Sequence, residues 1–304
     1  MLARLMAVLC AALALQSAVA APLPVTEVAA GVFMHTGVHE EFGEDYHGDI
    51  ANIGFVIGDT AIAVIDTGGS FRIGQSLREA IRARSSLPIR YVINTHVHSD
   101  HIFGNAAFEQ DRPEFIGHAR LAGAMRIRAE GYESNLRKML GADADGSRIV
   151  LPTREVSVEL ALDLGGRRLL LRAWPPAHTD HDLTVLDERT GTLWMGDLLF
   201  VDRAPSIDGD AKGWLAVIES LKALPAARAV PGHGPLVEDK AVHLDRLRGY
   251  LDVLMADLRR GIAAGRPMRD VVRDAAAAER PRWQLFDTVN LRNAEQLYMQ
   301  LEWE

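Results

Sequence analysis

The segment Thr95-His96-Val97-His98-Ser99-Asp100-His101 concentrates side chains that bind metal ions. Burying three imidazoles and a carboxylate in an apolar core without partners would cost several kcal/mol. The segment directly follows an apolar stretch at residues 91–94 and leads toward a helix-like stretch. Strand ends that lead into helices are where α/β proteins build sites. Because imidazole and carboxylate suit zinc or iron at neutral pH, we interpret the segment as a metal site rather than a solvated loop.

Three more polar residues occur in the same context, each soon after an apolar stretch that predicts a strand. His178 follows residues 168–174, Asp197 follows residues 192–195, and His233 follows residues 228–230. A single histidine in such a place is more often structural than metal-binding. Together with the first segment, however, they place seven potential ligands at one edge of the predicted sheets. These are His96, His98, Asp100, His101, His178, Asp197 and His233.

The elements that must position these ligands alternate between strands and helices, which favours a layered α/β fold. Two rounds of the alternation follow one another without a Pro-, Gly- or Ser-rich linker, so we expect one domain built from two similar halves. From Lys240 onward the pattern is mostly helical. Helices are predicted at 73–84 and 212–224, and strands at 32–34, 53–57, 61–65, 91–94, 114–116, 155–162, 168–174, 183–186, 192–195 and 228–230.

The first twenty residues have the pattern of a secretory signal. A short basic start precedes an apolar run at residues 5–15, and Ala18-Val19-Ala20 supplies small residues for cleavage after Ala20. The run is too short to span a bilayer, and no second candidate span follows it. We therefore expect a periplasmic mature protein, residues 21–304, without a stable membrane span. An uncleaved membrane anchor is the alternative.

The charge and the cysteine content limit which partners the mature protein can have. Cleavage would remove Cys10, the only cysteine, so no disulfide could form. It would also remove Arg4, which leaves 32 basic residues against 41 acidic ones and a net charge of −9. Phosphate binding needs a basic surface, so this acidic balance argues against a nucleic-acid partner. A small-molecule substrate is the expected partner.

The ordered motifs H-x-H-x-D-H, His-Thr, Gly-Asp and Pro-Gly-His-Gly resemble those of the metallo-β-lactamase superfamily, over about residues 25–237. The resemblance implies a four-layer αββα sandwich of two mixed β-sheets flanked by helices. It also implies a single domain over residues 21–304, with a helical C-terminal extension at about 240–304.

The same resemblance implies two metal ions, with Zn²⁺ expected and iron as the alternative. His96, His98 and His178 would hold the first metal, Asp100, His101 and His233 the second, and Asp197 would bridge them. Two such metals imply a hydrolase that uses a metal-bound hydroxide. Asp100 would also help to position or accept the proton.

Three residues are expected beside the ligands rather than among them. Asp66, in Ile65-Asp66-Thr67-Gly68, resembles an acidic residue that orients a ligand histidine, although a plain strand-ending turn is the alternative. His118, in Gly117-His118-Ala119, is expected near the site but outside the metal ligands. His181 is expected behind the ligands or at the rim of the site, with ligation as the alternative.

Three histidines near the mature N-terminus form a looser group, His35, His39 and His47. In a fold of this family the early hairpin overhangs the site, so these side chains could line the mouth of a substrate cavity. An exposed loop is an equally good interpretation. The sequence does not decide between them.

Asp197 distinguishes branches within the family. Branches that hydrolyse β-lactams generally have cysteine or serine at this position, whereas thioesterase-like and phosphodiesterase-like branches have aspartate. The motif at residues 195–203, with Asp208-Gly209, Gly213-Trp214 and the chain end at 301–304, is similar to exported glyoxalase-II-like zinc hydrolases. That group is associated with quinoprotein dehydrogenase and sulfur-oxidation systems. The resemblance therefore implies a periplasmic thioester or small-ester hydrolase linked to such a system, with a metallo-β-lactamase as the second choice.

Two alternatives belong to other functional classes. Some family members oxidise persulfides with a single iron held by two histidines and one aspartate. The presence of Asp100, His101 and His233 argues against that chemistry in this chain. A non-catalytic metal-binding partner protein is the other alternative, because a fold alone does not fix function.

Overall fold

The computed structural model describes residues 20–41, 43 and 46–304. The predicted signal segment falls almost wholly outside this part of the chain, so its cleavage after Ala20 stays a prediction. Within the described residues, no helix combines the length and the apolar character needed to cross a membrane.

The first sheet has seven strands in the order β1-β2-β3-β4-β5-β6-β7. Strands β1 to β4 pair antiparallel, and β4 to β7 pair parallel, so the sheet is mixed. The strands are β1 (Thr26–Ala29), β2 (Val32–His35), β3 (Ile53–Ile57), β4 (Ile62–Ile65), β5 (Ile89–Ile93), β6 (Glu114–His118) and β7 (Arg154–Val156).

The second sheet has five strands in the order β12-β11-β10-β9-β8. Its pairs are antiparallel except for β11 and β12, which run parallel. The strands are β8 (Glu159–Asp163), β9 (Arg168–Ala173), β10 (Leu183–Asp187), β11 (Thr192–Phe200) and β12 (Arg228–His233).

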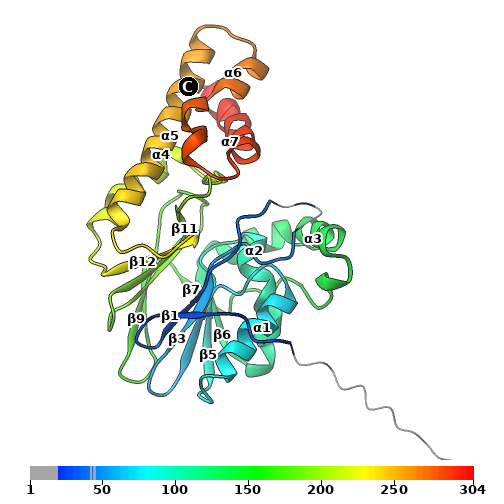
Figure 1. Ribbon diagram of the computed structural model, residues 1–304, viewed down its shortest axis with the longest axis vertical. Helices are drawn as coiled ribbons and strands as arrows, with labels where there is room; N and C mark the ends of the chain where they lie inside the picture. Colours follow the sequence, from blue (N-terminus) through cyan, green and yellow to red (C-terminus); the bar gives the residue numbers. More distant parts are fainter. Residues whose placement is uncertain (1–19, 42, 44–45) are drawn as a thin grey trace, which may run out of the picture.

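Helices cover the outer face of each sheet (Figure 1). The α-helices are α1 (Phe71–Arg82), α2 (Ser99–Ile102), α3 (Leu121–Leu140), α4 (Ala211–Ala223), α5 (Lys240–Ala263), α6 (Met268–Asp274) and α7 (Phe286–Leu301). Three 3-10 helices accompany them in the described part, η1 (Phe103–Asp111), η2 (Gly141–Ala144) and η3 (Ala277–Arg282).

Three apolar layers hold the elements together. The faces of the two sheets meet in one cluster that includes Ile65, Ile93 and Val185. A second cluster lies between the first sheet and α1, and a third, the largest, joins the second sheet to α4, α5 and α7. The arrangement confirms the expected four-layer αββα sandwich. It also explains why β4 and β11 are apolar runs, because both are buried along their whole length.

The predicted elements occur close to their expected bounds, except at two strands. The strand predicted at 192–195 continues to Phe200 as β11. Residues 155–162 do not form a single strand: β7 ends at Val156 in the first sheet, and β8 begins at Glu159 in the second. The two residues between them carry the chain from one sheet to the other. Both pieces have strand-forming sequences, so local propensity gives no sign of the change of sheet.

Candidate metal centre

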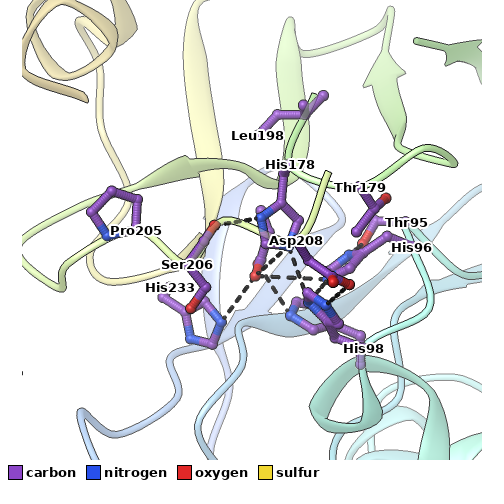
Figure 2. Close-up of polar contacts among 12 residues, drawn as sticks. Thr95, His96, His98, His178, Thr179, Leu198, Pro205, Ser206, Asp208 and His233 are labelled. Atoms are coloured by element: carbon purple, nitrogen blue, oxygen red, sulfur yellow. Dashed lines mark hydrogen bonds and ion pairs between the residues drawn. The ribbon is translucent and has the colours of Figure 1, made fainter. Parts of the chain in front are cut away.

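The ligand-type side chains come from four places in the fold that meet at one edge of the sheets. Figure 2 shows four of them, His96, His98, His178 and His233. His96 and His98 lie in the loop after β5, and Asp100 and His101 lie in α2, the single turn that follows. His178 follows β9. His233 is the last residue of β12. All seven predicted side chains are thus brought together.

Asp197 is placed differently from the expectation. Strand β11 does not stop before it but continues to Phe200, and its pairing with β12 is irregular around Gly196. Gly196 has a φ of 50°, and a Cβ there would lie 2.7 Å from the Thr95 side chain. A bulge of this kind re-aims the neighbouring side chain, and it accounts for the position of Asp197 inside the site.

The first cluster contains His96, His98, His178 and Asp197, whose ligand atoms all lie within 4.8 Å of one another. Nδ1 of His98 is 3.0 Å from Nε2 of His96 and 3.0 Å from Nε2 of His178. Oδ2 of Asp197 is 3.3 Å from Nε2 of His178. Three imidazole nitrogens and one carboxylate oxygen therefore face one point.

The second cluster contains Asp100, His101 and His233. Oδ2 of Asp100 lies 3.6 Å from Nε2 of His101 and 3.4 Å from Nε2 of His233. Asp197 reaches this cluster as well, because its Oδ1 is 3.1 Å from Nε2 of His101 and its Oδ2 is 3.4 Å from Nε2 of His233. One carboxylate thus lies between the two clusters.

The far nitrogen of each histidine has a partner that fixes the tautomer. Nδ1 of His178 donates to the carbonyl oxygen of Ser206 at 2.8 Å, and Nδ1 of His233 donates to that of Ile50 at 2.7 Å. Carbonyl oxygens only accept, so these rings carry their proton on the far side. The lone pair of Nε2 is then directed at the cluster, as in metal-ligating histidines.

For His101 and His98, the partner of the far ring nitrogen is a carboxylate. Oδ2 of Asp66 accepts from Nδ1 of His101 at 2.8 Å, and Oδ2 of Asp208 accepts from Nε2 of His98 at 3.0 Å. Asp66 also accepts from the backbone N–H of Thr95 at 2.8 Å. The aspartate predicted behind a ligand histidine therefore lies behind His101, with its own position fixed by the loop that carries the first two histidines.

Thr95 links Asp66 to a second histidine. Its hydroxyl donates to Oδ2 of Asp66 at 2.7 Å, and Nδ1 of His96 lies 3.0 Å from the same hydroxyl oxygen. Because the Thr95 hydroxyl donates its proton to Asp66, its oxygen can only accept a hydrogen bond from Nδ1–H of His96. Nε2 of His96 then also presents a lone pair to the cluster.

These tautomers test whether the site suits metal ions. Without a cation, the lone pairs of His96, His98 and His178 would face one another at 3.0 Å, which is repulsive. Nε2 of His101 and Oδ1 of Asp197 are buried and form no hydrogen bond among the described residues. Buried polar atoms normally have partners. The donor set of imidazole and carboxylate suits zinc, iron and similar divalent ions, so the residues fit a pair of metal ions.

The charge of the site favours cations. Burial opposes ionisation of Asp197, but the nearby His233 and His101 hold the pKa of its carboxyl well below its ordinary value. Burial likewise lowers the pKa of the His178 imidazole to about 3 and that of His96 well below its ordinary value. The ionised Asp197 carboxylate and the neutral imidazoles of His96 and His178 are the protonation states that metal binding requires. In the second cluster Asp197 and Asp100 outweigh burial and raise the pKa of His101 well above its ordinary value and that of His233 above it, so metal binding there would release their protons.

A cavity of about 560 Å³ opens onto the site. Helix α3 supplies an apolar wall that includes Leu136 and Met139, and α7 lies on another side. His98, Asp100, Asp197 and His233 line the cavity together with cationic residues. Those cations are Arg128, Lys138, Arg203 and Arg292.

Sequence reasoning missed two residues that support the site. Asp208, noted only as part of a motif, contacts His98 and also pairs with Nη2 of Arg128 at 2.8 Å. Arg128, on α3, donates to the hydroxyl of Tyr132 at 3.0 Å. The only available signal was the Asp-Gly at 208–209, which is typical of an ordinary turn.

His118 and His181 are buried near the site but belong to neither ligand cluster. Nδ1 of His118 accepts from the backbone N–H of Arg120 at 3.0 Å. Nδ1 of His181 lies 2.9 Å from the hydroxyl of Thr179, and burial lowers the pKa of His181 to about 4.

None of the three N-terminal histidines is among the described residues that line the cavity. His35 is buried between Asp49 and the carbonyl oxygen of Pro24. His39 is half-buried with its Nδ1 2.9 Å from the side-chain oxygen of Gln284, and His47 is exposed.

The model of the metallo-beta-lactamase superfamily matches residues 47–233, well over half of the chain and all seven clustered side chains. The chain belongs to the metallo-beta-lactamase superfamily. A comparison with curated protein sequences found no match.

Solved structures of the superfamily share the fold of this chain. It is similar to a metallo-beta-lactamase from Pontibacter korlensis, with a TM-score of 0.60 and 21% identity, over 76% of this chain and 99% of that one. It is also similar to TMB-1, with a TM-score of 0.60 and 19% identity, over 76% of this chain and 97% of that one. At these identities the likeness concerns the fold alone. Members of the superfamily to which the family model assigns this chain are generally hydrolases that bind divalent metals, and the His/Asp clusters could supply the ligands.

Proposed function

We propose that this protein is a dinuclear zinc hydrolase of the glyoxalase-II-like type, acting on a thioester or related small ester in the periplasm. The observation that carries the proposal is the double cluster joined by Asp197, whose carboxylate lies within 3.4 Å of His178 in the first cluster and of His101 and His233 in the second. His96, His98 and His178 would hold one ion, and Asp100, His101 and His233 the other. Aspartate at position 197 supports the thioesterase-like branch over a β-lactamase.

Two divalent cations in such a site supply an activated water molecule and polarise the bond to be cleaved. The chain's own residues supply the rest. His233 and Asp100 line the cavity at the second cluster, so a substrate carbonyl can approach them from the apolar wall of α3. The Asp100 carboxylate would accept the proton from the attacking water. The apolar side chains of the cavity wall would reduce the contact of the ester with bulk water.

The predicted export signal and the resemblance to exported hydrolases support a periplasmic location and a link to a quinoprotein or sulfur-oxidation system. Both are part of the proposal. They rest on residues 1–20 and on the motif at 195–203, together with its companions at 208–214 and 301–304.

The test measures both the metal content and the turnover of the same protein samples. The protein purified from periplasm without added metal should contain about two zinc ions per chain by elemental mass spectrometry, and should hydrolyse simple thioesters. Asp197→Ala and His98→Ala should lose both properties, whereas the control His47→Ala removes an exposed histidine and should keep them. About one iron per chain with oxygen uptake on a persulfide would favour sulfur oxidation instead. Retention of turnover in Asp197→Ala would overturn the proposal.

A further inference from the structure

Phe200 packs against one histidine of each ligand cluster. Its ring is stacked on that of His233, with the centroids 5.2 Å apart and the planes 14° from parallel. The same ring meets that of His178 edge to face, with the centroids 5.6 Å apart and the planes at 60°. These are separations at which aromatic pairs attract one another. His178 belongs to the first cluster and His233 to the second, so one side chain contacts ligand rings of both.

The extension of β11 beyond its predicted end places this ring. Phe200 is the last residue of the strand and pairs in register with His233 of the parallel strand β12. The backbone N–H of Val201 donates to the carbonyl oxygen of His233 at 3.0 Å. Trp214 of α4 packs on the same rings, with its centroid 6.3 Å from that of Phe200 and 5.3 Å from that of His178. Phe200 and Trp214 are both buried, so the apolar core holds them in place.

Hydrogen bonds alone do not fix the planes of the two imidazoles. Nδ1 of His178 donates to the carbonyl oxygen of Ser206, and Nδ1 of His233 donates to that of Ile50. A single hydrogen bond leaves a ring free to turn about the line of that bond, and the second side-chain torsion of histidine is itself broad. An aromatic ring packed on the imidazole restricts this rotation. It thereby fixes the direction of the Nε2 lone pair, on which metal binding depends.

Phe200 reaches the metal centre only through these histidines. It has no polar side-chain atom and is not among the described residues that line the cavity, so it does not contact the substrate. Asp208 differs from it, because among the described residues its carboxylate hydrogen-bonds to one ligand ring, that of His98. Loss of Asp208 therefore affects one cluster directly, whereas loss of Phe200 affects a ligand in each.

We propose that Phe200 is a positioning residue for both metal sites, which holds the rings of His178 and His233 so that each directs Nε2 at its cluster. The inference rests on the dinuclear centre of the proposed function and does not depend on which ester is hydrolysed. Its signature is that removing one buried, apolar side chain weakens two metal sites together.

The test is a zinc titration of the metal-free protein in competition with a chromophoric chelator, which gives one dissociation constant for each site. In Phe200→Leu we expect both constants to rise by about tenfold, between the effect of losing one aromatic contact and that of losing a hydrogen bond behind a ligand. Asp208→Ala should raise one constant more than the other.

Phe55→Leu is the matched control. Phe55 is also fully buried and stacked on an aromatic ring, that of Phe33, with the centroids 4.9 Å apart and the planes at 18°. It lies in the apolar cluster between the first sheet and α1, which contains neither of the rings that pack on His178. This variant loses a comparable aromatic contact and should bind both zinc ions like the wild type.

Two spectroscopic measurements separate positioning from a general loss of stability. Loaded with Co²⁺, Phe200→Leu should have ligand-field absorption bands that differ from those of the wild type, and Phe55→Leu should not. In the zinc-loaded wild type labelled at histidine and phenylalanine, nuclear Overhauser effects should join the Phe200 ring to the rings of His178 and His233. The second measurement does not require any variant to fold.

Unchanged constants in Phe200→Leu, a change in only one of them, or an equal change in Phe55→Leu would overturn the inference. So would unchanged Co²⁺ bands in Phe200→Leu or the lack of either Overhauser contact. Thioester hydrolysis by the same wild-type samples separates this inference from the proposed function. If the wild type binds two zinc ions but hydrolyses no thioester, only the proposed function fails. If it hydrolyses thioesters and Phe200→Leu keeps both constants, only the role of Phe200 fails.

Discussion

Asp208 accepts a hydrogen bond from His98, with Oδ2 3.0 Å from Nε2 (Figure 2). The two residues are 110 positions apart in the sequence. The carboxylate is itself held by Arg128 of α3, so a helix that contributes no ligand to either cluster helps to orient the His98 ring. This contact connects the wall of the cavity to the first ligand cluster.

Removing that contact should weaken metal binding without removing a ligand. In Asp208→Ala the ring of His98 loses the acceptor that fixes its tautomer, and we expect the affinity of the first cluster to fall by about 10- to 100-fold. Competition with a chromophoric chelator measures this. Asp287→Ala, which removes a 71% exposed carboxylate on α7, should bind metal like the wild type. An unchanged affinity in Asp208→Ala would contradict the role given to this contact.

Asp66→Asn should reduce metal binding at the second cluster. Asparagine tolerates the left-handed φ of 52° at this position, so the backbone is preserved. The amide nitrogen of the introduced asparagine, however, would take the place of Oδ2 and can only donate. Nδ1 of His101 would then have to accept, and the ring proton would move to Nε2, the atom that faces the metal site. We expect metal content to fall from about two ions per chain toward one. Two firmly bound ions in this variant would show that Asp66 does not set the tautomer.

The buried pair Arg167–Asp187 should contribute strongly to stability. Arg167 donates to Asp187 at 2.9 and 2.7 Å and to the carbonyl oxygen of Ile57 at 2.8 Å, which joins the second sheet to β3 of the first. Arg167→Met leaves a buried carboxylate without its cation, so the free energy of unfolding should fall by about 3–5 kcal/mol. Denaturant titration measures it.

The neighbouring pair Arg168–Glu188 provides the matched control for this prediction. The Arg168 side chain is 58% exposed, and exposed ion pairs contribute less than about 1 kcal/mol. Arg168→Met should therefore have little effect. Similar losses in the two variants would show that burial of Arg167 is not the cause.

His35 should make stability depend on pH. Burial tends to lower its pKa, but the hydrogen bond and charge of Asp49, together with the Pro24 carbonyl oxygen, outweigh burial and raise the pKa of the folded protein above the ordinary 6.5. A raised pKa in the folded state means that protonation stabilises it. The contribution is complete below the ordinary pKa and is lost as pH rises through the raised value.

His35→Gln should therefore cost more stability near about pH 5.5 than near about pH 9, on either side of the ordinary histidine range. Denaturant titrations of wild type and variant at both pH values measure the difference, and comparing the two proteins cancels the pH dependence of metal binding. A difference in stability that does not change with pH would exclude a stabilising protonated His35.

The seven ligand-type residues could be found from the sequence because each depends on local order. An apolar stretch predicts a buried strand. A polar residue at or near the end of that strand lies at the edge of the sheet, independently of how the other elements are arranged. His96 after β5 and His233 at the end of β12 follow this rule. The same rule places Asp197 after a strand at 192–195, but β11 continues to Phe200, and it is the bulge at Gly196 that turns Asp197 into the site.

The residues that surround the ligands could not be found in this way. Asp208 lies in a loop, Arg128 on α3 and Arg203 in a turn, and their meeting at one cavity depends on how distant elements pack. Charged residues in such segments are usually solvated, so nothing in their local sequence marks them.

The sequence by itself therefore determined the family, the layered α/β fold and the set of side chains that meet at the edge of the sheets, because these follow from hydrophobic periodicity and short motifs. Only the tertiary structure decided where the chain passes from β7 to β8, which tautomer each histidine adopts, and that Nε and Nη1 of Arg203 are buried without a hydrogen-bond partner among the described residues. Those properties depend on atoms that are far apart in the chain, and burial and hydrogen bonding are set by the assembled structure rather than by neighbouring residues.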